Sequence, residues 1–155
     1  TKPILYRHFG DRGGLVQAAA DRFGEDLVTR LAAALGRSEP SRARLAAAID
    51  AYLAFVEEEP GLYRYLTQHA EAAGPALTGV VDRVGALIAR EIGEGLRAAR
   101  ADSGAAEPWA YGIVGMIHMA GAQWVARPTL PRQRLVEYLT TLVWDGMGSA
   151  RPLGP

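Results

Sequence analysis

The chain has 155 residues, of which 49% are hydrophobic and 22% charged, so it is long enough for one sizeable core and has the composition of an ordinary globular protein. Its 17 basic and 17 acidic residues balance, which excludes a protein that coats nucleic acid along its whole length. The absence of cysteine excludes a disulfide framework, a thiolate metal site and a cysteine nucleophile, and it fits the reducing cytoplasm, where we expect this protein to act.

The charges are unevenly distributed along the chain. In residues 1–15, Lys2, Arg7 and Arg12 outnumber Asp11, which gives a local net charge of +2. Residues 50–71 carry five carboxylates against Arg64, a local net charge of −4. The N-terminal segment is therefore the part of the chain that favours a polyanion.

Proline and glycine divide the chain into segments with helical periodicity, and no segment alternates with period two as a strand does. We therefore predict an all-α fold. The first long helix has a strong apolar stripe with i+4 spacing, from Leu15 to Leu35, and Asp11 is a suitable N-cap for it. The predicted helices span residues 12–35, 42–58, 62–70, 74–101, 109–127 and 132–147, with a frayed tail after residue 148.

The N-terminal fifteen residues read as a short helix, a Gly-Asp break and the start of the long helix. By residue type alone, two explanations stay open. Tyr6 and Phe9 could simply pack beneath the next helix as core residues. Alternatively, the polar and basic side chains around them, Lys2 and Arg12 among them, could contact DNA phosphates from a helix in the major groove.

The string Lys-Pro-Ile-Leu-Tyr-Arg-His-Phe, followed by Gly-Asp-Arg-x-x-Leu, resembles the recognition helix and following helix of the tetracycline-repressor (TetR) family of bacterial transcription regulators. The resemblance implies a ligand-responsive regulator, a repressor by default, whose dimer binds double-stranded operator DNA. It places Phe9 and Leu15 in the core. The DNA-contacting residues that it implies are Thr1, Lys2, Pro3, Ile4, Tyr6, Arg7, His8 and Arg12.

Members of the family have two further helices before this point, which pack against the recognition helix. We therefore expect that DNA binding belongs to a longer parent protein rather than to this chain alone. The expected organisation is residues 1–35 as the end of the helix-turn-helix domain with its connecting helix, residues 41–149 as a ligand-binding and dimerisation domain, and residues 150–155 as a tail.

Residues 109–126 carry no formal charge, and the length of this uncharged segment approaches that of a membrane span. The glycines, His118 and Gln123 dilute this segment and the other helices are amphipathic, so we expect no membrane association and instead a helix buried on most sides. In the family, the last two long helices pair with their copies in a second subunit. The resemblance thus implies a homodimer formed through residues 109–127 and 132–147, and the alternative is that these helices bury only against their own chain.

No catalytic constellation, metal-ligand spacing or phosphate loop is present in the sequence, so we expect neither an enzyme nor a bound metal or cofactor. The resemblance implies a ligand cavity among the middle helices, for an apolar or amphipathic molecule such as a fatty acid, a lipid or a hydrophobic drug, with His69 or His118 as polar contacts. The alternative function is a helical small-molecule-binding module without DNA binding. The candidate lining residues are Tyr52, Phe55, Leu62, Tyr63, Leu66, His69, Val84, Leu87, Trp109, Met116, Ile117 and Trp124.

Overall fold

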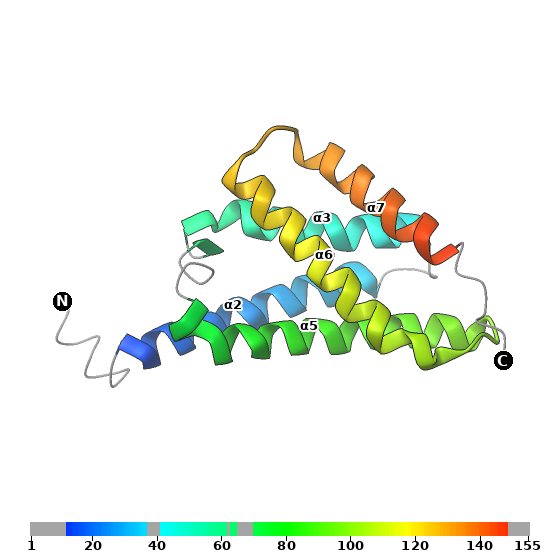
Figure 1. Cartoon of the computed structure of the whole chain (residues 1–155), viewed down its shortest axis with the longest axis horizontal. Coiled ribbons are helices and arrows are strands. Elements are labelled where there is room, and N and C mark those ends of the chain that lie inside the picture. The colour runs from blue at the N-terminus through cyan, green and yellow to red at the C-terminus, as the bar shows by residue number, and fades with distance from the viewer. Residues whose placement is uncertain (1–11, 37–40, 62, 65–69, 149–155) are drawn as a thin grey trace.

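The computed structural model describes residues 12–36, 41–61, 63–64 and 70–148, and within these ranges it is built of helices without a strand. This confirms the all-α fold class. The division into domains stays a prediction. In chain order the elements are α2 (Arg12–Leu35), α3 (Arg42–Glu58), α5 (Ala70–Ala98), the short 3-10 helix η1 (Ser103–Ala105), α6 (Ala106–Ala126) and α7 (Arg132–Gly148) (Figure 1).

The bounds of α5 differ from the prediction at both ends. The helix begins at Ala70, and it continues through Gly74 and Pro75, where the sequence predicted its start. An interior proline removes one backbone hydrogen bond and costs about 3 kcal/mol, which a long packed helix can offset. At the other end, Arg100 adopts a left-handed φ of 56°, and the N–H of Ala101 donates to the carbonyl of Leu96 at 2.9 Å. This is a Schellman motif, so the helix ends at Ala98 rather than near residue 101.

Helix α6 begins three residues earlier than predicted, at Ala106, with Pro108 inside its first turn. The first N–H groups of a helix have no intrahelical acceptor, so a proline there loses no hydrogen bond. The predicted bounds of α2 and α3 agree with the structure, and α7 extends to Gly148. Ser41 caps α3 by accepting a hydrogen bond from the N–H of Arg44 at 3.2 Å.

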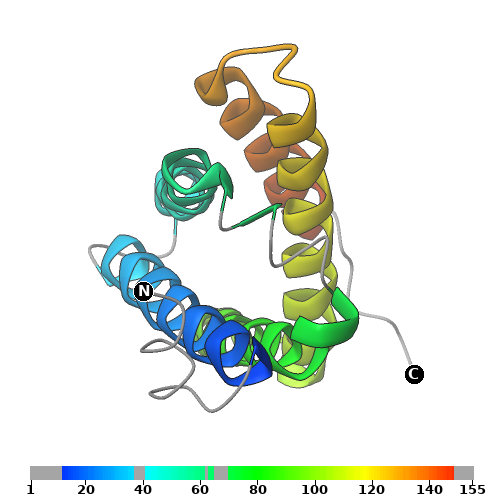
Figure 2. The same cartoon turned by 90° about the vertical axis from the view of Figure 1, so that its left-hand side faces the viewer.

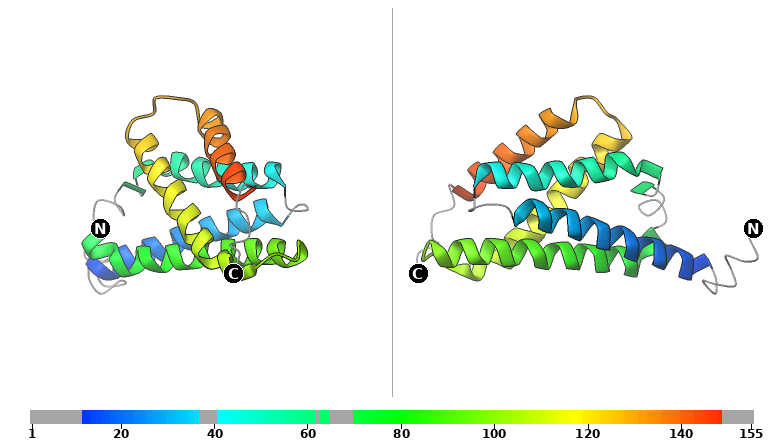
Figure 3. Two further views of the ribbon diagram at one scale, coloured as in Figure 1. Left: turned by 45° about the vertical axis from the view of Figure 1, so that its right-hand side comes forward. Right: turned by 180° about the vertical axis from the view of Figure 1, so that it is seen from behind.

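The helices form two pairs joined by a diagonal crossing helix. Helices α2 and α5 lie side by side and run in the same direction, while α3 packs against α2 on one side and α7 on the other (Figures 1 and 3). Helix α6 starts against α5 and crosses toward α3 (Figure 3). Seen along α2, the helices α2, α3, α5 and α6 surround a common space (Figure 2).

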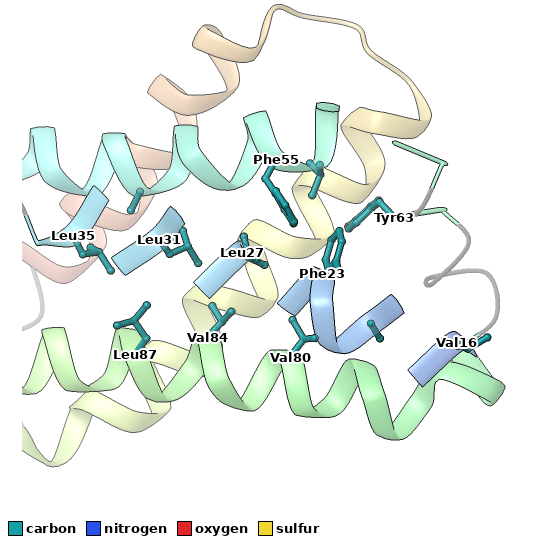
Figure 4. Packing of buried hydrophobic residues seen from close by; sticks show 13 residues of the cluster. Val16, Phe23, Leu27, Leu31, Leu35, Phe55, Tyr63, Val80, Val84 and Leu87 are labelled. Carbon is teal, nitrogen blue, oxygen red and sulfur yellow. The ribbon is translucent and has the colours of Figure 1, made fainter. Parts of the chain in front are cut away.

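The larger core cluster follows the apolar stripe of α2. Phe23, Leu27, Leu31 and Leu35 are buried between α3 and α5, as the spacing predicted (Figure 4). At the start of the helix, Val16 and Ala20 are buried and Ala19, on the predicted stripe, is half-buried, while the side chain of Leu15 lies outside what the structure describes. A strict i+4 series drifts around a helix of 3.6 residues per turn, so the buried face moves by one residue over several turns.

A second core cluster joins α3, α6 and α7. Ile49 and Leu53 of α3 pack with Trp124 of α6 and with Val136 and Leu139 of α7. Helices α3 and α7 are also linked by Arg132, whose Nε donates to Asp50 at 2.9 Å and whose Nη1 donates to Glu57. The carboxylates of Asp50 and Glu57 are therefore about half exposed, and they link α3 to α7.

Candidate functional site

A cavity of about 500 Å³ lies between α2, α3, α5 and α6, with the end of α7 at its edge. Its walls are almost entirely apolar, which suits a hydrophobic or amphipathic ligand. The lining residues are Phe23, Leu27, Leu31 and Leu35 of α2; Ser41, Arg44, Leu45, Ala48, Ile49 and Tyr52 of α3; Tyr63; Val80, Val81, Val84, Ile88, Glu91, Ile92, Gly95 and Leu96 of α5; Trp109, Ile113, Val114, Ile117 and His118 of α6; and Trp144 and Met147 of α7.

Three polar side chains meet at one place in this apolar wall. Nδ1 of His118 lies 3.1 Å from the hydroxyl of Tyr52 and 3.2 Å from that of Tyr63, and the two hydroxyls are 3.4 Å apart. Burial lowers the pKa of His118 and raises those of both tyrosines, that of Tyr52 further through its proximity to Tyr63. All three groups are thus held neutral, and together they can exchange hydrogen bonds with an uncharged polar group of a ligand.

A charged pair occupies a second place on the cavity wall. Nη2 of Arg44, in the first turn of α3, donates to Oε2 of Glu91 on α5. Only 14% of the Arg44 side chain and 19% of the Glu91 side chain is exposed. They are the charged residues of the described cavity lining.

The structure brings five of the candidate lining residues to the cavity, Tyr52, Tyr63, Val84, Trp109 and Ile117, and His118, expected as a polar contact, lines it too. Four others are not among the residues that line it: Phe55, Leu87, Met116 and Trp124.

These four have other partners or positions. Phe55 stacks on Phe23 with ring centroids 4.6 Å apart, and Leu87 is buried in the core cluster that follows α2. Nε1 of Trp124 donates to the carbonyl of Leu130 at 2.8 Å, which turns its indole toward α7. Met116 is partly buried one position before the lining residue Ile117, but it is not among the residues that line the cavity.

Several predicted site residues fall outside what the structure describes. Of the ligand set these are Leu62, Leu66 and His69. Of the DNA-contacting set they are residues 1–4 and 6–8 and the side chain of Arg12, so only the helix that follows the N-terminal segment is described.

The sequence did not point to the four α2 residues of the cavity wall, to Arg44 and Glu91, or to Trp144. The i+4 stripe of α2 predicts burial, but a buried stripe looks the same whether it faces side chains or a cavity. Arg44 and Glu91 are 47 positions apart, so no local spacing signals their contact.

Helices α6 and α7 present large apolar side chains to solvent. Met119 is 67% exposed, Leu142 59%, Tyr138 56% and Tyr111 38%. Within this chain α6 is therefore not buried on most sides, contrary to the expectation from its composition. Among its residues, only Ala106, Ala110, Gly121 and Trp124 are buried.

No described helix is long and apolar enough to cross a membrane. No group of three or more metal-ligating side chains lies together in the same part of the chain.

The chain is similar to known regulators along most of its length. Residues 30–153 match the family described as Tetracyclin repressor-like, C-terminal domain. Two HTH-type transcriptional regulators from two strains of Mycobacterium tuberculosis are each 30% identical to it over 149 residues, or 95% of this chain and 64% of the relative. The HTH-type transcriptional activator FasR of Mycolicibacterium smegmatis is 29% identical over 157 residues, covering 95% of this chain and 68% of FasR.

The chain thus spans about two thirds of the length of these curated relatives. The family match covers well over half of the chain, and it agrees with the all-α arrangement and with the resemblance of the N-terminal segment. On this basis the chain belongs to the TetR family of transcriptional regulators.

Proposed function

We propose that the full-length protein is a ligand-responsive transcriptional regulator of the cytoplasm, which binds operator DNA as a dimer and is released by a small apolar or amphipathic ligand. One observation carries this proposal. Helix α2, which directly follows the segment that resembles a recognition helix, contributes Phe23, Leu27, Leu31 and Leu35 to the cavity wall. A molecule in the cavity therefore contacts the helix that leads to the DNA-binding segment.

The proposed mechanism is a shift between two arrangements of this helix. Without ligand, the dimer holds its recognition helices at a spacing that fits successive major grooves. A ligand that binds better to an arrangement with a different tilt of α2 shifts the population toward it and weakens DNA binding. The effect is limited by the difference in ligand affinity between the two arrangements.

Dimerisation through α6 and α7 is part of the proposal. Regulators of this family generally dimerise and bind DNA. The exposed side chains of Tyr111, Met119, Tyr138 and Leu142 supply an apolar surface on these two helices. Gly112 and Gly115 of α6 have open space where a Cβ would stand, so a helix of a second subunit can approach closely there.

Whether the protein represses or activates transcription requires a separate measurement. We propose repression that a ligand relieves, whereas the relative FasR is named as an activator. A DNA-binding assay measures release by ligand, and a reporter gene measures the sign.

The first test is native mass spectrometry of the purified protein. We expect the mass of two subunits plus a co-purified small apolar molecule. The extracted molecule is then added to the full-length protein on a DNA fragment from upstream of its own gene, and the retarded band should be lost. A dimer that carries the molecule but never binds DNA would instead identify a helical small-molecule-binding module. Unchanged DNA affinity at saturating ligand would refute the release mechanism for that molecule.

A further inference from the structure

We propose that the ligand of this cavity carries a carboxylate, and that this carboxylate binds Arg44 in place of Glu91. The inference rests on the proposed function, because it concerns the same cavity, and it names the chemical class of the ligand and the contact that the ligand replaces.

The position of the ion pair is the first argument. Arg44 belongs to α3, which packs against α2 and α7, and Glu91 belongs to α5, which packs against α2 and α6. The two helices lie on different sides of the space seen in Figure 2. Both side chains line the cavity, so the pair bridges α3 and α5 at the cavity wall. A ligand that fills the cavity therefore meets this bridge.

The charge of Arg44 is the second argument. A guanidinium stays protonated in proteins, so a largely buried one needs an anion beside it. A carboxylate matches it in charge and in planar, two-oxygen geometry. An alcohol or ester offers no charge, so it cannot replace Glu91. The cavity thus distinguishes an anionic amphiphile from a neutral one of the same length.

The surroundings of Glu91 make the exchange possible. While its Oε2 accepts from Arg44, its Oε1 accepts from Nη2 of Arg90 at 3.2 Å. The Arg90 side chain is 61% exposed, so it connects Glu91 to solvent. When a ligand takes Arg44, Glu91 keeps a cationic partner, and no buried carboxylate is left uncompensated.

The surroundings of Arg44 favour an anion and leave room for its tail. Arg44 lies in the first turn of α3, which contains no acidic side chain and has the positive end of the helix dipole. From Arg44 to Tyr52 the helix rises about 12 Å, and Leu45, Ala48 and Ile49 between them line the cavity. An apolar tail bound there loses its contact with water, which provides the free energy for the exchange.

The test compares dodecanoate with 1-dodecanol, which share a chain length and differ in charge. Their affinities for the whole chain are measured by titration of tryptophan fluorescence, since Trp109 and Trp144 line the cavity. The wild type should prefer dodecanoate by about tenfold or more. Arg44→Gln should abolish this preference. Glu91→Gln should increase it, because the competing carboxylate is gone.

Two further variants keep the result interpretable. Arg44→Gln/Glu91→Gln leaves no unpaired charge in the wall, so it should fold, bind dodecanol and show no preference. Arg30→Gln is the matched control, because it removes an exposed arginine that pairs with Glu58 at 2.7 Å outside the cavity, and the preference should persist.

A wild type without a preference, or an Arg44→Gln variant that retains it, would overturn the proposal. If the wild type binds both probes equally, only the carboxylate assignment fails and the apolar cavity stands. If it binds neither, the proposed ligand site itself fails together with this inference.

Discussion

His118 shows how a polar side chain is accommodated in an apolar cavity wall. Its Nδ1 interacts with the hydroxyls of Tyr52 and Tyr63, which come from different parts of the chain, and its ring lies edge-on to that of Tyr63 at 5.9 Å between centroids. These contacts give Nδ1 of the neutral imidazole two hydroxyl partners. They offer no negative charge to an imidazolium, which is why burial lowers the pKa of His118.

The lowered pKa of His118 predicts a loss of stability in weak acid. The unfolded chain takes up a proton on this histidine near pH 6.5, roughly the ordinary value, while the folded protein resists protonation to lower pH. Protonation thus favours the unfolded state, and the contribution of His118, fully present above pH ~6.5, is lost as the pH falls below it.

The measurement is the melting temperature of the wild type and of His118→Asn between about pH 8 and about pH 5.5. The wild type should lose more of its melting temperature over this range than the variant. His8 and His69 are present in both proteins, so their titration cancels in the comparison. Parallel curves for the two proteins would contradict the prediction.

At the residue scale, the sequence indicated individual side chains of the cavity wall more readily than the contacts between them. Tyr52 and Tyr63 were expected in a ligand site, and both line the cavity. Their shared contact with His118 joins residues 55 and 66 positions apart. Such contacts depend on how helices cross, which residue periodicity does not encode.

At the scale of the helix, glycine decides how closely two elements approach. Gly24 of α2 faces α5, and a Cβ placed there would lie 2.7 Å from Cγ2 of Val80 and 2.3 Å from Nη2 of Arg83. Arg83 is exposed and can move, whereas Val80 is buried in the core. The close approach of α2 to α5 at this point therefore depends on the absence of a side chain at Gly24.

Gly24→Ala should lower the free energy of unfolding by about 1–3 kcal/mol, because α2 and α5 must separate to admit the methyl group. Gly79→Ala on α5 is the control. It has nothing within 4 Å of a Cβ, and alanine should raise the stability by up to about 1 kcal/mol through helix propensity. Urea denaturation measures both. Equal stabilisation by the two substitutions would show that the contact at Gly24 is looser than the structure indicates.

The outer face of α7 provides a test of the proposed dimer. Leu142 is 59% exposed in the single chain, so replacing it should not disturb the core. Leu142→Glu places a charge where two apolar surfaces are proposed to meet, and it should raise the dissociation constant of the dimer by about 100-fold or more. Sedimentation equilibrium measures the change. Ala32→Glu on the exposed side of α2 is the control and should leave the dimer intact.

Most helix bounds were predictable because they depend on local chemistry. The predicted bounds of α2 and α3 agree with the structure, while the start of α5 does not, since a proline weakens a helix without having to begin it. The exposure of α6 was not predictable from its composition. Its apolar residues fit a helix buried in one chain and a helix buried between two chains equally well.

At the scale of the whole molecule, the arrangement of the helices determines which helices a bound ligand can move relative to one another. The cavity is not inside one helical pair. It lies between α2 and α5 on one side and α3 and α6 on the other, so its occupancy acts on how these elements sit relative to one another. The stripe of α2 predicted a core face, and only the crossing of α6 turns part of that face into a cavity wall.

A side chain that occupies the cavity should therefore mimic the ligand. Ile117 of α6 lines the cavity and is partly buried, so Ile117→Phe adds volume there without replacing a fully packed core residue. In the full-length protein this variant should bind dodecanol at least about tenfold more weakly, because it competes for the same space. Its DNA affinity without ligand should move in the direction in which ligand moves the wild type.

Met116→Phe separates this effect from a general disturbance of α6. Met116 is the neighbouring residue on the same helix but does not line the cavity, so its variant should retain ligand binding and DNA affinity. Fluorescence anisotropy of labelled DNA measures the affinities of both variants. If Ile117→Phe weakened ligand binding while its DNA affinity stayed at the wild-type value, occupancy of the cavity would not be coupled to α2. The proposed shift of α2 would then be wrong even though the cavity binds ligand, because filling the cavity and moving the helix would be separate events.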